Sequence, residues 1–167
     1  MGFWKCVAYM AILGLLTFPA GRVFKRMNLR WDRGIFRTRP WERGGVAYER
    51  MGIRRWKDLV PDVSKVFPRI VPRKAIGARP GTAALEDMLA ETCVAELVHL
   101  LLPVPGLALL WLWPGKGGAI VYFLYVMVGN LPFIVIQRYN RPRFARLLAA
   151  AAARERRRMN AGSDTVQ

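Results

Sequence analysis

Residues 119–136 read AIVYFLYVMVGNLPFIVI, and this stretch decides the class of fold. It carries no charged side chain, and its length suits a helix that crosses a hydrocarbon core of about 30 Å. Stretches 3–20 and 94–113 are similarly long and apolar, with Lys5 and Glu96 as their charged residues. The sequence therefore predicts an all-α membrane protein with three transmembrane helices. Buried helices of a soluble protein are the alternative, but too little polar chain remains to cover three such spans.

The first stretch could instead be a cleaved signal peptide. Phe18, Pro19 and Ala20 make a poor small-x-small cleavage site, and the preceding region holds one lysine. We therefore expect the first span to be retained as a membrane anchor.

Cations are distributed unevenly along the chain, which has a formal net charge of +16 and is 53% hydrophobic. Residues 22–92 hold 17 of the 27 Lys and Arg, and residues 137–167 hold 8. Cation-rich loops stay on the cytoplasmic side of a membrane. The sequence predicts a cell-membrane protein with its N-terminus outside, an outer hairpin at 114–118 and its C-terminus in the cytoplasm.

The polar parts of the chain are expected to belong to a single membrane domain, residues 1–167. Segment 22–92 interleaves aromatic rings with cations, which is typical of the lipid headgroup region, and it lacks any nucleic-acid fingerprint. Within it we expect a short helix over 48–57, and a helix that Thr82 caps and that continues into the second span. A basic helical tail is expected over 144–159, followed by disorder over 160–167.

Glu96, His99 and Asn130 are polar side chains inside the second and third apolar spans, where they are costly and mark candidate sites. Glu96 and His99 are three residues apart on one helix face, and His99 lies roughly 8 Å inside the inner boundary. Asn130 of the third span lies roughly 10 Å below the same boundary. Because a short hairpin makes these spans neighbours, the three side chains can meet beneath a rim of Gln137, Arg138, Asn140 and Arg141.

A histidine beside a carboxylate can act as a general base near neutral pH. Arg138, Arg141 and Arg143 could hold a phosphate or pyrophosphate through their planar guanidinium groups. The alternative is that Glu96, His99 and Asn130 merely hold the helices together. One His and two Cys exclude a multi-ligand zinc site. A di-iron site is disfavoured because the second histidine of its motif is missing. Cys93 is disfavoured as an acyl-carrying nucleophile because it points away from His99 on the helix.

Three motifs resemble those of the glycosyl-4,4'-diaponeurosporenoate acyltransferases, membrane proteins of staphyloxanthin-type carotenoid synthesis. They are Trp56-Lys57-x-x-x-Pro61-Asp62, Glu91-Thr92-x-x-Ala95-Glu96-Leu97-Val98-His99 and Asn130-x-Pro132-x-Ile134-x-Ile136-Gln137-Arg138-Tyr139-Asn140-Arg141-Pro142-Arg143. The resemblance covers the chain from about Phe36 to Arg146.

The resemblance implies an O-acyltransferase that moves a fatty acyl group from acyl-CoA, a co-substrate, to a sugar hydroxyl of a glycosyl-carotenoid or related glycolipid, without a cofactor. His99 would deprotonate the hydroxyl, Glu96 would orient His99, and Asn130 would donate to the oxyanion. Trp56 and Lys57 would join the rim residues in binding substrate. Two alternatives stay open: transfer of another activated group to a lipid alcohol, or a non-catalytic scaffold that binds anionic lipid or a partner enzyme.

Overall fold

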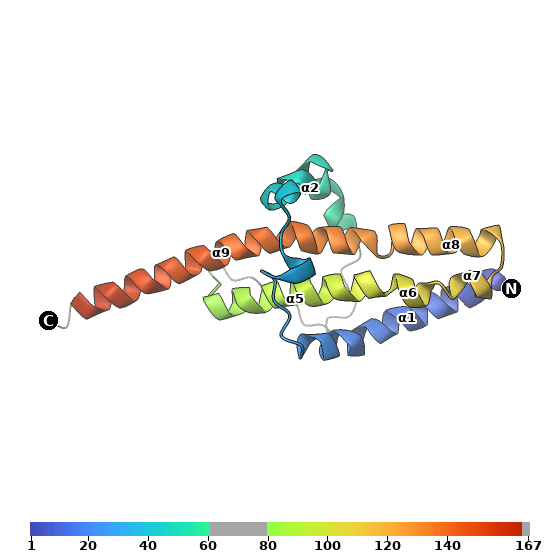
Figure 1. Cartoon of the computed structure of the whole chain (residues 1–167), viewed down its shortest axis with the longest axis horizontal. Coiled ribbons are helices and arrows are strands. Elements are labelled where there is room, and N and C mark those ends of the chain that lie inside the picture. The colour runs from blue at the N-terminus through green and yellow to red at the C-terminus, as the bar shows by residue number, and fades with distance from the viewer. Residues whose placement is uncertain (61–79, 165–167) are drawn as a thin grey trace. The chain divides into compact units, whose positions relative to one another are not determined.

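The computed structural model describes residues 1–60 and 80–164, with side chains up to Ala161. These residues form helices and no strand, which confirms the prediction of an all-α chain (Figure 1). Three helical segments are long and apolar enough to cross a membrane: Gly2–Lys25, Thr82–Leu112 and Lys116–Ala161. The prediction of three segments suited to cross a membrane is therefore confirmed, although two of them are not single continuous helices.

The chain divides into two compact units. The first unit comprises Met1–Arg37 and Ala90–Arg138, and the second comprises Thr38–Leu89 and Tyr139–Gln167. Two helices, α5 (Thr82–Leu101) and α9 (Leu131–Asp164), contribute residues to both units.

Helix α1 (Gly2–Lys25) packs in the first unit beside the two short helices α6 (Pro103–Gly106) and α7 (Leu109–Leu112) and the longer α8 (Lys116–Met127) (Figure 1). Its buried side chains are Cys6 and Leu13, while many of its apolar residues are exposed. Such exposure is ordinary for a helix whose outer face meets lipid. The anchor role of the first span stays a prediction.

The second apolar segment is broken into α5, α6 and α7 because two prolines interrupt its helical hydrogen bonds. Pro103 and Pro105 donate no backbone hydrogen bond, and the chain tightens after them through the Leu107 amide to the Val104 carbonyl. Tyrosine hydroxyls bond the carbonyls of the break: Tyr9 to Pro105 at 2.9 Å and Tyr122 to Pro103 at 3.4 Å. Inside a membrane such backbone groups need partners from the protein, and these tyrosines supply two of them.

The third apolar segment is interrupted between α8 and α9, at residues 128–130. Gly129 permits the interruption, because a Cβ there would lie 2.7 Å from the Tyr125 carbonyl oxygen. Helix α9 then begins at Leu131, with the Asn130 carbonyl accepting its first backbone hydrogen bond, from Ile134. The interruption thus places an asparagine immediately before the first turn of α9.

Within residues 38–60 of the second unit the structure has four short helices: η2 (Pro40–Gly45), α2 (Val46–Arg50), α3 (Ile53–Trp56) and η3 (Lys57–Leu59). The predicted single helix over 48–57 is therefore wrong. Gly52 divides it, since its φ of 71° is a left-handed conformation that favours glycine and ends a right-handed helix. The buried Glu42 holds this region together by accepting hydrogen bonds from the Arg39 amide and the Tyr48 hydroxyl, both at 2.5 Å.

The ends of two helices differ from the prediction. Thr82 is the first residue of α5 rather than its cap, because the Gly81 carbonyl accepts the hydrogen bond from Leu85 and the Thr82 hydroxyl bonds Glu155. Helix α9 continues to Asp164 instead of ending at Met159, so the disorder expected from residue 160 is wrong for residues 160–164. The motif residues Pro61 and Asp62 lie outside the described residues, as does the tail 165–167.

Candidate functional site

His99 and Asn130 meet in the first unit, as the sequence predicted. The imidazole Nδ1 of His99, on α5, lies 3.1 Å from the Asn130 side-chain oxygen, just before α9. Asn130 is 1% exposed, whereas His99 is half-buried. Part of the imidazole surface is therefore open, whereas the amide that bonds it is enclosed.

The hydrogen bonds of Asn130 fix which nitrogen of His99 carries the proton. The Asn130 Nδ2 donates to the Tyr125 carbonyl oxygen at 2.9 Å, and a carbonyl oxygen can only accept. The amide oxygen must then be the atom that faces His99, so Nδ1 is the donor. In a neutral imidazole this arrangement leaves the lone pair on Nε2, which is the form that a general base requires.

Phe133, in the first turn of α9, stacks on the His99 ring. The ring centroids are 4.4 Å apart and the planes differ by 10°. An aromatic face in this position attracts a cation, so it favours the imidazolium that forms when His99 takes a proton. Together with Asn130, it holds the ring in one orientation.

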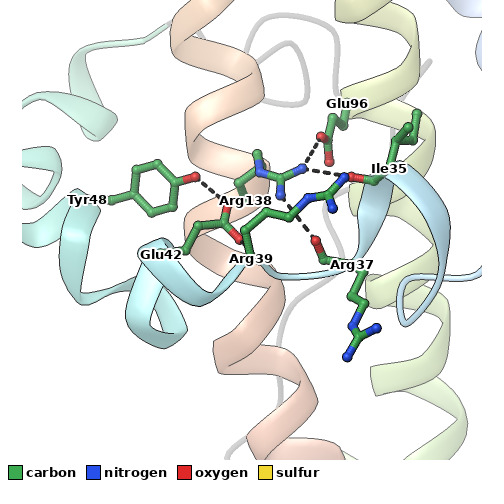
Figure 2. Close-up of polar contacts among 7 residues, drawn as sticks. All are labelled: Ile35, Arg37, Arg39, Glu42, Tyr48, Glu96 and Arg138. Carbon is green, nitrogen blue, oxygen red and sulfur yellow. Dashed lines mark hydrogen bonds and ion pairs between the residues drawn. The ribbon is translucent and has the colours of Figure 1, made fainter.

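Glu96 forms a buried ion pair with Arg138. The carboxylate is 2% exposed and its Oε1 lies 2.7 Å from Arg138 Nη1. The same guanidinium donates to the carbonyl oxygens of Ile35, at 3.0 Å, and Arg37, at 3.3 Å (Figure 2). Asn130 rather than Glu96 therefore makes the hydrogen bond recorded at His99 Nδ1, and Glu96 positions Arg138.

The remaining predicted rim residues are divided between the two units. Gln137 is half-buried on α9 in the first unit, and Asn140, Arg141 and Arg143 follow it in the second. Arg141 is 1% exposed. Arg143 lies over the Tyr139 ring, 4.8 Å from its centroid, and also donates to the Tyr139 hydroxyl. These two arginines contribute to packing in the second unit.

Trp56 and Lys57 lie at the junction of α3 and η3 in the second unit. The Trp56 indole nitrogen donates to the Met51 carbonyl at 3.3 Å, and both side chains are half-buried. Nearby, the Arg54 guanidinium hydrogen-bonds Glu49 and lowers the pKa of that carboxyl. Tyr139 also donates to Glu49, at 3.3 Å, so a polar network ties the short helices to α9 within this unit.

Sequence reasoning missed the partners that come from outside the spans. The backbone of residues 35–37 gave no signal, because carbonyl groups are the same in every residue. Phe133 was one apolar residue among many, and only the pairing of α5 with the start of α9 reveals its stacking. Among the described residues no group of three His, Cys, Asp or Glu is placed to hold a metal, and Cys93 is fully buried.

The sequence of the chain matches a family model described as glycosyl-4,4'-diaponeurosporenoate acyltransferase over residues 32–150. The chain belongs to this family. The matched residues include His99, Asn130 and the Glu96–Arg138 pair. The match also covers the stretch from about Phe36 to Arg146, in which the motifs show the resemblance. Family membership makes the protein an acyltransferase.

Two relatives that carry the family's name come from Staphylococcus aureus strains N315 and USA300. Each is 29% identical to this chain over 147 residues, which is 86% of this chain and 86% of the relative. The similarity therefore extends over nearly the whole length of both proteins. No solved structure matches this acyltransferase.

Proposed function

We propose that this acyltransferase transfers a fatty acyl group from acyl-CoA to a sugar hydroxyl of a glycosylated carotenoid or a closely related glycolipid. The observation that carries the proposal is the His99–Asn130 hydrogen bond, which leaves the Nε2 lone pair on a half-buried imidazole within an apolar span. Esterification of a lipid-borne hydroxyl needs a base at such a position, because the acceptor is held in the membrane.

The proposed reaction has two proton transfers through one nitrogen. His99 Nε2 takes the proton from the sugar hydroxyl as its oxygen attacks the thioester carbonyl. The tetrahedral intermediate collapses, the carbon–sulfur bond breaks, and the imidazolium returns the proton to the leaving thiolate. The products are an ester and free CoA, and His99 ends in its starting form.

Asn130 acts in this scheme as a positioning residue instead of an oxyanion donor. Its oxygen accepts from His99, one N–H of its nitrogen donates to the Tyr125 carbonyl, and burial keeps the side chain away from an incoming substrate. The amide resists rotation of the imidazole and holds the proton on Nδ1. Phe133, which stacks on the ring, favours the transient imidazolium.

The names of the relatives support the proposed acceptor, and the charge distribution supports the proposed location of the enzyme. The relatives are named for a glycosyl-4,4'-diaponeurosporenoate, a glycosylated carotenoid, and such a substrate partitions into lipid. We place the enzyme in the cell membrane with its N-terminus outside and its C-terminus in the cytoplasm, where acyl-CoA is made. The cation-rich segments 22–92 and 137–167 support this orientation.

An acyl-transfer assay tests the proposal. Purified protein in lipid nanodiscs receives labelled acyl-CoA with a glycosylated carotenoid, a glycosylated lipid or the unglycosylated carotenoid acid. We expect a labelled ester with the glycosylated acceptors, and none with the acid. Ester on no acceptor, together with tight binding of anionic lipid, would favour a scaffold, and transfer of a group other than acyl would favour the other enzymatic alternative.

A further inference from the structure

A short turn carrying two arginines is fastened beside the proposed site. The turn η1 (Gly34–Phe36) lies between Arg33 and Arg37, and Gly34 allows it to form with a φ of 57°. Phe36 is buried, and the carbonyls on either side of it, Ile35 and Arg37, accept hydrogen bonds from Arg138. The backbone of the turn is therefore fixed to α9 within the first unit.

The side chains of Arg33 and Arg37 remain exposed on this fixed turn. Figure 2 shows the Arg37 side chain extending away from Arg138, although its carbonyl is bonded to that residue. Within residues 1–60 and 80–161, neither guanidinium makes an ion pair. Two uncompensated cations flanking one rigid turn form a surface that attracts anions.

The neighbouring carboxylate does not neutralise this surface. Asp32 is hydrogen-bonded by the Arg30 guanidinium at 2.8 and 3.0 Å, and this contact lowers the pKa of the Asp32 carboxyl. Arg30 and Asp32 thus compensate each other. Arg33 adds a weaker attraction to the same carboxylate and keeps its exposed guanidinium.

Arg138 itself is a poor phosphate ligand because its guanidinium is already occupied. Its side chain is 14% exposed, and its nitrogens bond Glu96 and two backbone carbonyls. Withdrawing it from Glu96 would leave a buried carboxylate uncompensated. The prediction that Arg138 binds phosphate is therefore replaced here, and other cations must bind the phosphates of the donor.

We propose that Arg33 and Arg37 bind the phosphate groups of the thioester donor, with Arg138 holding their turn in place. The inference rests on the proposed acyl-CoA reaction. Glu96, the partner of Arg138, is three residues from His99 on α5, a rise of about 4.5 Å. The pantetheine arm of CoA separates the thioester from the phosphates, so the phosphates can stay on this exposed turn while the thioester reaches the imidazole.

The test compares two donors that differ in their phosphates. Wild type and the Arg33→Gln/Arg37→Gln double variant are assayed with acyl-CoA and with acyl-pantetheine, which has the same thioester and no phosphate. The measured quantity is the ratio of kcat/KM for acyl-CoA to kcat/KM for acyl-pantetheine. In nanodiscs of zwitterionic lipid we expect this ratio to fall about tenfold in the double variant.

A matched control is Arg55→Gln, which removes an exposed arginine of the second unit and should leave the ratio unchanged. An unchanged ratio in the double variant would overturn the proposal. A loss seen equally with both donors, and only in nanodiscs that contain anionic lipid, would also overturn it and would assign the turn to lipid headgroup phosphates.

A binding measurement distinguishes failure of the phosphate site from failure of the proposed acyl transfer. Equilibrium binding of CoA and of pantetheine to the same proteins does not depend on chemistry. Preference for CoA over pantetheine that is lost in the double variant would support the phosphate site even if wild type forms no ester. Equal binding of both compounds by wild type would contradict it.

Discussion

At the scale of single residues, the site depends on one imidazole whose hydrogen-bond partner is fixed by a second hydrogen bond. His99 and Asn130 could be predicted because polar side chains are costly in apolar spans and these two fall at the same depth. The partner of Glu96 could not be predicted, since a carboxylate near the inner boundary has several arginines within reach in the sequence. The structure gives it Arg138.

Replacing His99 by Gln removes the base while keeping a polar side chain of similar size. We expect kcat/KM for acyl transfer to fall by about 10²–10⁴. The measurement is ester formation in nanodiscs, with thermal unfolding of the variant as a control for folding. Wild-type rates in a folded His99→Gln protein would remove His99 from the mechanism.

Replacing Asn130 by Ala removes the group that positions the ring. We expect kcat to fall about tenfold or more with little change in KM, because substrate binding does not involve the buried amide. Steady-state kinetics with both substrates measure kcat and KM separately. A variant with raised KM and unchanged kcat would instead place Asn130 in contact with substrate.

At the scale of elements, the lengths of the spans were predictable but their interruptions were not. Apolar runs of sufficient length identify spanning segments regardless of local geometry. Pro103 and Pro105 could have kinked one helix, and whether they divide it depends on partners such as Tyr9, which comes from another helix. The break at Gly129 places Asn130 beside His99, so the interruption that the sequence did not reveal creates the site.

The hairpin between α7 and α8 provides a test of close packing. A Cβ on Gly118 would lie 2.1 Å from the Trp113 carbonyl oxygen, a contact that requires the backbone to move. We expect Gly118→Ala to lower the unfolding temperature and the yield of folded protein. Gly14→Ala is the matched control, because nothing lies within 4 Å of its Cβ and alanine favours a helix. Equal stability of both variants would contradict the packing.

The Glu96–Arg138 pair should contribute to stability as well as to the position of the turn. Removing one partner leaves a buried charge uncompensated, so we expect Arg138→Gln to destabilise the protein by about 3 kcal/mol. The Glu96→Gln/Arg138→Gln double variant should lose less than the sum of the single losses. Denaturation of the four proteins in one detergent measures this coupling, and strict additivity would show that the pair does not interact.

At the scale of the whole molecule, apolar and charged residues are separated along the chain, and this separation made the class of protein predictable. The arrangement of residues 38–60 was not, because its buried Glu42 and left-handed glycines carry no periodic pattern. Charge asymmetry predicts the orientation of the chain. A reporter inserted at Gly117 should be external, and one fused after Gln167 should be cytoplasmic. A cytoplasmic reporter at Gly117 would reverse the proposed orientation of the site.

The protein contains a single histidine, so the imidazole can be observed without interference. Nitrogen NMR of protein labelled with ¹⁵N at the histidine ring reports which nitrogen bears the proton. In the neutral form we predict a protonated Nδ1 and a lone pair on Nε2, with this preference weakened in Asn130→Ala. A proton on Nε2 of the wild-type protein would contradict the proposed base, because the lone pair would then face Asn130 instead of the substrate.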